Sequence, residues 1–159
     1  MWHPGQPWIW KAGGLGVFDP GINALSILTS ILPSTLSMRS AQLCYPRNCE
    51  TPIAAQLVLA DTNGVRVDVE LDFLQTGPPM WDIEVETDLG GMRVSMGGTA
   101  MTVGNRPIET QDATEYGSMY AHFADLIRRR ALDVDVAPLQ LVADALLCGQ
   151  RIDVEPFIE

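Results

Sequence analysis

The sequence predicts an α+β fold, with an open, mostly antiparallel β-sheet that carries helices on one face. The hydrophobic pattern has a helical period near the start, a period of two from about residue 36, and a helical period again from about residue 116. Strands and helices are therefore segregated along the chain and do not alternate. The 159 residues are 47% hydrophobic and contain no linker or repeat, so we expect one domain over residues 1–159.

The first helix is expected to follow Asp19-Pro20. Residues 1–18 are rich in Gly, Pro and Trp and have no period, which indicates a loop. Asp19 supplies an N-cap carboxylate, and Pro20 suits the first helical turn. Residues 22–32 place an apolar face at helical spacing until Pro33 ends the helix. This apolar stretch is about half the ~20 residues of a membrane span, so no transmembrane helix is expected.

The sheet is predicted from alternating patterns in the middle of the chain. Residues 65–73 have apolar odd positions and mostly charged even ones, as a half-buried strand does. Asn63-Gly64 is a preferred hairpin dipeptide, and residues 53–59 alternate on its other side. The glycine pairs 90–91 and 97–98 are expected to turn the chain between later strands. A mostly antiparallel sheet of about five to seven strands follows.

Two further helices are expected near the end of the chain. Apolar residues recur at helical spacing over 116–127 and 139–146, and these helices are expected to cover one face of the sheet. The opposite face carries Asp68, Glu70 and Asp72. We interpret it as a solvated or partner-facing surface, which is the more common role of such a charged strand face than an acidic binding site.

The charge balance argues against nucleic-acid binding. The chain has 10 Lys and Arg against 20 Asp and Glu, a net charge of -10, which repels a phosphate backbone unless basic residues cluster. The run Arg128–Arg130 ends a helical pattern, where cations favour the helix dipole. The chain is expected to bind neither nucleic acid nor a membrane.

The cysteines and the amino terminus indicate a cytoplasmic protein. The amino terminus lacks the basic-then-apolar order of a secretory signal. Cys44, Cys49 and Cys148 are odd in number and include no Cys-x-x-Cys pair, so we expect three reduced thiols and no structural zinc. No group of residues has metal-ligand spacing, and no metal is predicted.

Asp19 and Asn23 are the first candidate catalytic pair, because residues four apart lie on one face of a helix. A carboxylate can accept a proton while an amide holds a hydroxyl oxygen, a combination that suits alcohol oxidation. A helix cap and a common polar helix residue explain the same pair without catalysis. Gly14-Leu15-Gly16 is a weak match to a dinucleotide loop, since Asp19 replaces the third glycine and would repel pyrophosphate.

Two loops combine aromatic and hydrogen-bonding side chains as sugar sites do. Trp2 and His3 lie in one, and Gln75 and Trp81 lie in or beside the other. Loop packing, or a hairpin anchored by a core tryptophan, would also account for them. His122 falls within a helical pattern and is interpreted as a polar-face residue.

Several motifs together resemble the carboxy-terminal half of bacterial aldose 1-dehydrogenases that act on D-galactose and L-arabinose, a branch of the glucose-fructose oxidoreductase-like (Gfo/Idh/MocA) family. The matching segments are WHPGQ (2–6), GGLGVFDPGINALS (13–26), PIAA (52–55), QTGP (75–78), WDIEVET (81–87) and VEPF (154–157). The wider family commonly has histidine four residues after the motif's aspartate. Asn23 stands there in this chain, as expected for the aldose branch.

The resemblance implies what the chain does. Asp19 and Asn23 would be catalytic, and His3, Trp81, Trp2 and Gln75 would contact the sugar. NAD or NADP would be bound mainly by an amino-terminal Rossmann domain, which this sequence lacks, together with the family's catalytic lysine. The chain would then be a fragment whose complete enzyme oxidises the anomeric carbon of an aldose to a lactone.

Three readings stay open at the level of sequence. The chain is the substrate domain of such an enzyme, a non-catalytic sugar or cofactor sensor of the same fold, or an oligomerisation domain that forms a homo-oligomer through its exposed sheet face. Retained Asp19 and Asn23 favour the enzyme. The sequence distinguishes neither galactose from arabinose nor NAD from NADP.

Overall fold

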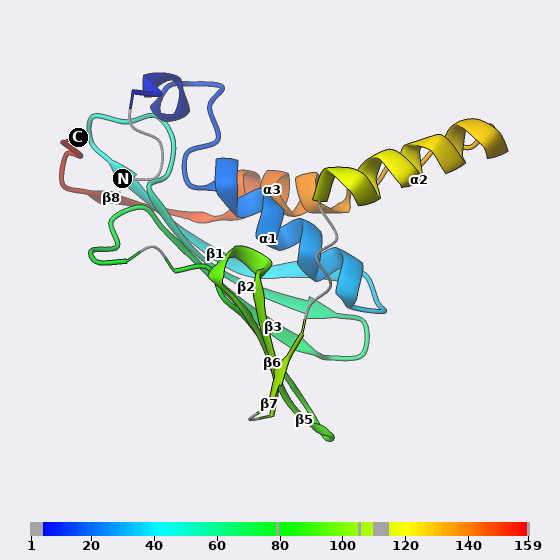
Figure 1. Cartoon of the computed structure of the whole chain (residues 1–159). Coiled ribbons are helices and arrows are strands. Elements are labelled where there is room, and N and C mark those ends of the chain that lie inside the picture. Colours follow the sequence, from blue (N-terminus) through cyan, green and yellow to red (C-terminus); the bar gives the residue numbers. More distant parts are fainter. Residues whose placement is uncertain (1–4, 79, 105, 110–114, 159) are drawn as a thin grey trace. The chain divides into compact units, whose positions relative to one another are not determined.

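The computed structural model describes residues 5–78, 80–104, 106–109 and 115–158. Within these ranges the chain forms three α-helices and two four-stranded sheets (Figure 1). The predicted α+β class is confirmed, and the pairing is mostly antiparallel as expected, because five of the six strand pairings among the described residues are antiparallel and one is parallel.

The described chain divides into two compact units, where a single sheet was expected. The first unit comprises Met1–Thr76 and Asp135–Glu159, and the second comprises Gly77–Val134. One boundary between the units lies within Gln75-Thr76-Gly77-Pro78, where glycine and a proline without an amide hydrogen disfavour strand pairing.

The sheet of the first unit has the order β3-β2-β1-β8. Its strands are β1 (Leu36–Pro46), β2 (Ala54–Asp61), β3 (Arg66–Asp72) and β8 (Gln150–Val154). The predicted alternation is confirmed in β2, where Ala55, Leu57 and Leu59 are buried. It is confirmed in β3 as well, where the charged positions are exposed and the apolar positions are half-buried.

The predicted hairpin at Asn63-Gly64 joins β2 to β3, and the buried carboxylate of Asp61 holds it together. One oxygen, Oδ1, accepts hydrogen bonds from the amides of Asn63 and Val65, each at 2.8 Å. Gly64 adopts the left-handed conformation, with φ of 86°. Burial raises the pKa of Asp61, but these hydrogen bonds outweigh it and leave the pKa below its ordinary value.

Two helices cover one face of this sheet, α1 (Phe18–Ile31) and α3 (Ala137–Cys148) (Figure 1). Gly21 permits α1 to lie close to β3, because a Cβ atom there would lie 2.5 Å from Cδ1 of Leu71. The core between the layers contains apolar side chains from α1, α3 and the two central strands β1 and β2: Phe18, Leu25, Leu43, Leu57, Leu59, Val142 and Ala145. Before α1, residues Pro7–Trp10 form a single 3-10 turn, η1.

The second unit contains a fully antiparallel sheet and one helix. The sheet has the order β4-β5-β6-β7, and α2 (Glu115–Arg129) follows it in the chain. The strands are β4 (Ile83–Thr87), β5 (Gly90–Ser95), β6 (Ala100–Val103) and β7 (Arg106–Ile108). The helix pair that covers the first sheet is thus α1 with α3, and the expected helix over 116–127 is α2 of the second unit.

The two glycine pairs differ in what they do. Gly97-Gly98 belongs to the 3-10 turn η2 (Met96–Gly98) between β5 and β6, as expected for a turn. Gly90-Gly91 instead begins β5, and Asp88-Leu89 make the turn before it. The hydroxyl of Thr87 stabilises that turn, because it accepts from the amide of Leu89 and donates to the carbonyl oxygen of Gly90.

Candidate functional site

Asp19 and Asn23 lie on one face of the first turns of α1, as their spacing predicts. Asp19 is half-buried and Asn23 is exposed. The opposite face of the helix is buried at Gly21, Leu25 and Leu28. The two polar side chains therefore project from the side of α1 that faces away from its buried contacts.

The expected N-cap role of Asp19 is wrong. The helix begins at Phe18. Val17 occupies the N-cap position, and the helix start has no side-chain capping hydrogen bond. The turn before the helix replaces such a cap, because the amides of Phe18 and Asp19 donate to the carbonyl oxygens of Leu15 and Gly16. Asp19 lies in the first turn, where a carboxylate interacts favourably with the helix dipole.

Two serines extend the polar face of α1 beyond Asp19 and Asn23. Ser26 and Ser30 follow Asp19 and Asn23 at spacings of three and four residues, and both are exposed. These four side chains share one face of the helix. The helical spacing of serines after the Asp-Asn pair was the signal that would have identified them.

The glycine loop before α1 is held in place by backbone contacts. Gly16 has φ of 55°, and a Cβ atom there would lie 2.2 Å from the carbonyl oxygen of Pro52. The amide of Val17 donates to that same oxygen at 2.8 Å. Only glycine permits this approach, so the loop fixes where α1 starts.

Three amides of this loop are already engaged. Gly14 donates to the carbonyl oxygen of Lys11 and Gly16 to that of Ile9, while the amide of Ala12 donates to Oε2 of Glu50 at 2.8 Å. A phosphate cradle needs free amides and no adjacent carboxylate. This arrangement supports the rejection of the loop as a dinucleotide site.

The connection between β1 and β2 also forms hydrogen bonds with the segment that precedes this loop. Oγ1 of Thr51, a buried residue, donates to the carbonyl oxygen of Ile9 at 2.7 Å, and the amide of Glu50 donates to that of Trp10 at 2.8 Å. Sequence reasoning missed Glu50 and Thr51, because a contact with a loop some forty residues away leaves no local pattern.

An aromatic cluster joins the residues just after β3 to the loop that precedes α1. The ring of Trp10 lies 5.4 Å from that of Phe73 and 5.2 Å from that of Phe157, measured between centroids. Gln75, which is half-buried, follows Phe73 by two residues. The structure thus places the predicted sugar contact Gln75 just beyond a strand end that is packed against the loop preceding α1.

Asn48 fastens the tail of the chain to the same region. Its Nδ2 donates to the carbonyl oxygen of Phe157 at 2.7 Å, and its Oδ1 accepts from the amide of Phe157 at 2.8 Å. Phe157 is thereby held beside Trp10. These two hydrogen bonds give the segment 154–157 a structural role that its sequence alone did not reveal.

The other predicted sugar contacts are distributed differently. Trp81 belongs to the second unit, where it is half-buried two residues before β4. Trp2 and His3 lie outside the described residues. The structure therefore brings Asp19 and Asn23 together on one helix face, and it describes Gln75 and Trp81 separately.

Two hollows of the first unit lie away from the Asp19–Asn23 pair. One, of about 240 Å³, lies between the end of α1 and the start of α3. The other, of about 310 Å³, lies on the sheet face that carries Glu70 and Asp72. Each is lined by both polar and apolar residues. Neither contains a predicted site residue.

The three cysteines are free thiols: Cys49 is buried, Cys44 is half-buried and Cys148 is exposed. Burial raises the pKa of the Cys49 thiol, which disfavours its reactive thiolate form. Among the described residues, no group of three or more His, Cys, Asp or Glu is arranged to hold a metal ion. Within the same ranges, no helix has the length and apolarity that a membrane span requires.

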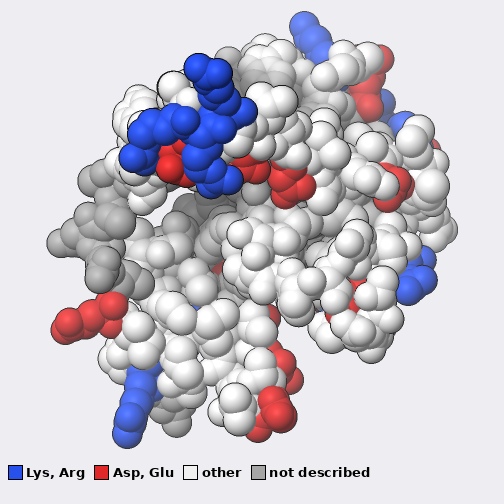
Figure 2. All heavy atoms as spheres, turned by 90° about the vertical axis from the view of Figure 1, so that its right-hand side faces the viewer, with Lys and Arg blue, Asp and Glu red and all other residues white. Residues whose placement is uncertain are grey.

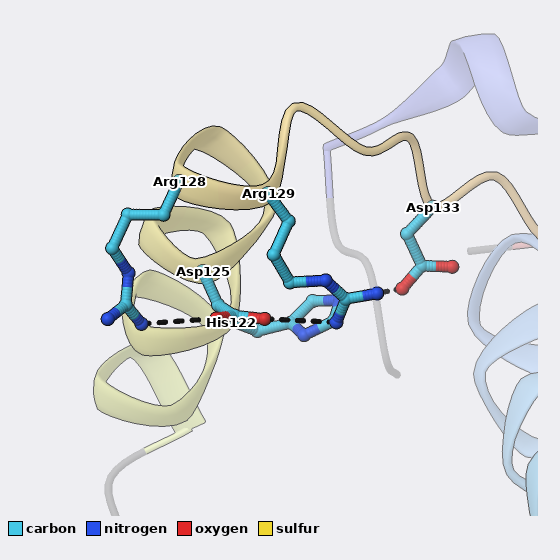
Figure 3. Close-up of polar contacts among 5 residues, drawn as sticks. All are labelled: His122, Asp125, Arg128, Arg129 and Asp133. Carbon is cyan, nitrogen blue, oxygen red and sulfur yellow. Dashed lines mark hydrogen bonds and ion pairs between the residues drawn. The ribbon is translucent and has the colours of Figure 1, made fainter.

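Two arginines of the basic run at the end of α2 are paired with one acidic residue. Arg128 and Arg129 each lie 3.1 Å from an oxygen of Asp125. Figure 2 shows the largest group of basic side chains on the displayed face beside acidic ones. This pairing (Figure 3) agrees with the interpretation of the run as a helix end and not as a nucleic-acid site.

Comparison with known proteins identifies relatives over nearly the whole chain, although no family model matches it. A galactose 1-dehydrogenase of Pseudomonas fluorescens is 44% identical over 158 residues, which are 99% of this chain and 52% of the relative. A crystal structure of a D-galactose-1-dehydrogenase protein from Rhizobium etli is 50% identical, has a TM-score of 0.93, and is matched over 99% of this chain and 50% of its own.

A more distant structure shares the fold alone. A variant of KijD10, a 3-ketoreductase from Actinomadura kijaniata solved with TDP-benzene and NADP, is 13% identical, with a TM-score of 0.71 over 91% of this chain and 51% of its own. The chain spans about half the length of the relatives it matches. It is homologous to galactose 1-dehydrogenases, and the resemblance inferred from its motifs is confirmed.

Proposed function

We propose that this chain is the substrate domain of an NAD(P)-dependent aldose 1-dehydrogenase, which oxidises the anomeric carbon of D-galactose or L-arabinose to the lactone. The observation that carries the proposal is the 44% to 50% identity with galactose 1-dehydrogenases over 99% of the chain. These relatives are named as dehydrogenases, which are enzymes, and galactose is the substrate given in their names. The shared helix face with Asp19 and Asn23 supports the same activity here.

The chemistry assigned to this chain is proton transfer and orientation. Asp19 accepts the proton of the anomeric hydroxyl group as the carbonyl forms, and Asn23 holds the hydroxyl oxygen in position through its amide. Acceptance of the hydride is the chemistry that a bound nicotinamide would supply. The only lysine, Lys11, lies outside the context of the family's catalytic lysine, so the second proton-handling group comes from elsewhere.

The cofactor is assigned to the half of the enzyme that this chain does not match. The amides of Ala12, Gly14 and Gly16 are engaged within the protein, so the loop offers no cradle for the cofactor phosphates. We expect the chain alone to bind neither NAD nor NADP tightly. Calorimetry checks this directly, and submicromolar binding would contradict the assignment.

Four further residues are proposed to contact the sugar. Gln75 and His3 would hydrogen-bond to hydroxyl groups, and Trp81 and Trp2 would stack on the apolar face of a pyranose ring. Support comes from their residue types and from the place of Gln75 beyond β3, next to the packed Phe73. Isotope-labelled chain titrated with galactose should show chemical-shift changes at these side chains.

The proposal is tested by completing the enzyme. The unmatched half of the Pseudomonas fluorescens relative, joined to this chain at the alignment junction, should oxidise galactose or arabinose with NAD or NADP. Sugar binding without turnover would favour a sensor, and a stable homo-oligomer through the sheet face without sugar binding would favour an oligomerisation domain. The cytoplasm is the proposed location, since the three free thiols suit a reducing compartment.

A further inference from the structure

The carbonyl oxygen of Ile9 joins two segments of the first unit that are distant in the chain. It accepts a hydrogen bond from Oγ1 of Thr51 at 2.7 Å and another from the amide of Gly16 at 3.2 Å. Thr51 lies in the connection between β1 and β2, and Gly16 lies in the glycine loop before α1. One acceptor therefore ties the Thr51 hydroxyl group to the loop from which α1 starts.

The loop packs closely against this acceptor and against Thr51 itself. A Cβ atom at Gly14 would collide with the carbonyl oxygen of Ile9, and one at Gly16 would collide with that of Pro52 and lie 3.0 Å from Cβ of Thr51. Close-packed groups pass a displacement on to their neighbours, because no free space absorbs it. A shift of the Ile9 carbonyl group should therefore move the loop.

The loop in turn sets the place of Asp19. The amide of Val17 donates to the carbonyl oxygen of Pro52 at 2.8 Å, and the amide of Asp19 donates to that of Gly16 at 3.1 Å. Gly16 connects the two ends, because its amide shares an acceptor with Thr51 and its carbonyl oxygen accepts from Asp19. A continuous series of hydrogen bonds therefore leads from the Thr51 side chain to the first turn of α1.

We propose that Thr51 is a positioning residue for the reaction. Its hydroxyl group holds the Ile9 carbonyl group, and through it the glycine loop, so that α1 presents Asp19 where the carboxylate can take the proton of the sugar. The inference rests on the proposed function, which assigns that proton to Asp19, and it deepens the function by adding a residue that acts through Asp19. Such placement matters to the rate, since an error of about 1 Å can cost about 100-fold in turnover.

A positioning role makes different demands from a purely stabilising one. A buried hydroxyl group that only stabilises the fold leaves the turnover of each folded molecule unchanged when it is removed. Loss of a positioning hydroxyl group lowers kcat in molecules that are fully folded, because the base is held less often in its productive place. That loss also disappears once the base itself has been removed, since the two residues act as one unit.

The first test measures kcat and KM of the joined protein described above, at a temperature at which every variant is folded. Thr51→Val keeps the shape of the side chain and removes the donor, so it should lower kcat about tenfold and change KM less than about twofold. Thr51→Ser keeps the donor and should keep kcat near that of the parent. Ser37→Ala is the matched control, because it removes a hydroxyl group that donates to the carbonyl oxygen of Ala60 at the other end of the β1-β2 pair, and kcat should not change. A parent-like kcat in Thr51→Val, or an equal loss in Ser37→Ala, would overturn the proposal.

A double-mutant cycle tests whether Thr51 acts through Asp19. In the Asp19→Asn background, Thr51→Val should lower kcat further by less than about twofold, because the group that it positions is already lost. A loss of about tenfold in both backgrounds would show that Thr51 acts elsewhere, and it would overturn the proposal.

Hydrogen exchange of this chain alone separates the inference from the proposed function. The amides of Val17 and Asp19 should exchange about fivefold faster in Thr51→Val, whereas the amide of Leu32, which donates to the carbonyl oxygen of Leu28 at the end of α1, should be unchanged. This local change in exchange, together with a joined protein that oxidises no aldose, would support the anchoring of Asp19 by Thr51 and contradict the proposed function. Oxidation by the parent, with unchanged exchange and kcat in Thr51→Val, would support the function and overturn the inference.

Discussion

Replacing Asp19 by Asn separates its proposed chemistry from its part in stability. Asp19 lies in the first turn of α1, and Val17 occupies the cap position. In that position the carboxylate interacts favourably with the helix dipole, a contribution of about 0.5 kcal/mol for a partly exposed group. Asn preserves the shape of the side chain but removes its charge and its basicity.

The two effects differ greatly in size. A loss of about 0.5 kcal/mol lowers the melting temperature by about 1 to 2 °C for a protein of this size. Loss of a general base lowers turnover by about 100-fold or more, which corresponds to about 2.7 kcal/mol of transition-state stabilisation. Asp19→Asn should therefore melt almost as the parent protein does and yet turn over at least about 100 times more slowly.

The assay is the steady-state rate of the joined protein with galactose and with arabinose, beside a thermal melt of each variant. Asn23→Ala serves as the matched comparison on the same helix face, and it should lower turnover by a smaller factor, because it disturbs orientation and leaves the base in place. Unchanged turnover in Asp19→Asn with an unchanged melt would remove Asp19 from the mechanism.

Three further variants test the scaffold of the site by urea unfolding. Gly16→Ala should lower the free energy of unfolding by about 3 kcal/mol, because its Cβ atom would meet a backbone carbonyl oxygen in a left-handed conformation, whereas Gly13→Ala, with φ of 87° and open space around it, should cost about 1 kcal/mol; equal losses would contradict this. The lowered pKa of Asp61 gives stability that is present above the unfolded pKa of about 3.9 and is lost as the pH falls through the folded value, so Asp61→Asn should lose less stability than the parent between pH 6 and pH 3. Asn48→Ala should speed amide exchange at Phe157, and an unchanged rate there would show that the two hydrogen bonds of Asn48 are not needed.

Local pattern predicted the elements whose burial follows a simple period. The strand over residues 66–72 and the helix over 116–127 each show one face in the sequence, and each is present in the structure. The short strands β7 and β8 were not predicted. β7 has only three residues, and β8 combines polar and charged residues with two apolar ones, so their pairing depends on neighbours and not on their own pattern.

The candidate site was predictable to a smaller extent. Helical spacing alone placed Asp19 and Asn23 on one face, and the structure retains that arrangement. The N-cap assignment failed because backbone carbonyl groups of the preceding turn bind the first amides, which no side-chain pattern reveals. The roles of Asn48 and Glu50 depend on contacts between distant segments, and only the folded chain shows them.

The parallel pairing of β8 with β1 has a consequence for how the protein is made. Gln42 pairs with Gln150, so the first sheet receives this strand only after the whole of the second unit has been synthesised. The second unit, Gly77–Val134, lies between these partners in the chain and has all four of its strands available earlier. On a ribosome, β1 to β3 and the sheet of the second unit should be available before β8, so the edge of β1 that β8 occupies should stay open to premature association with other chains until β8 emerges.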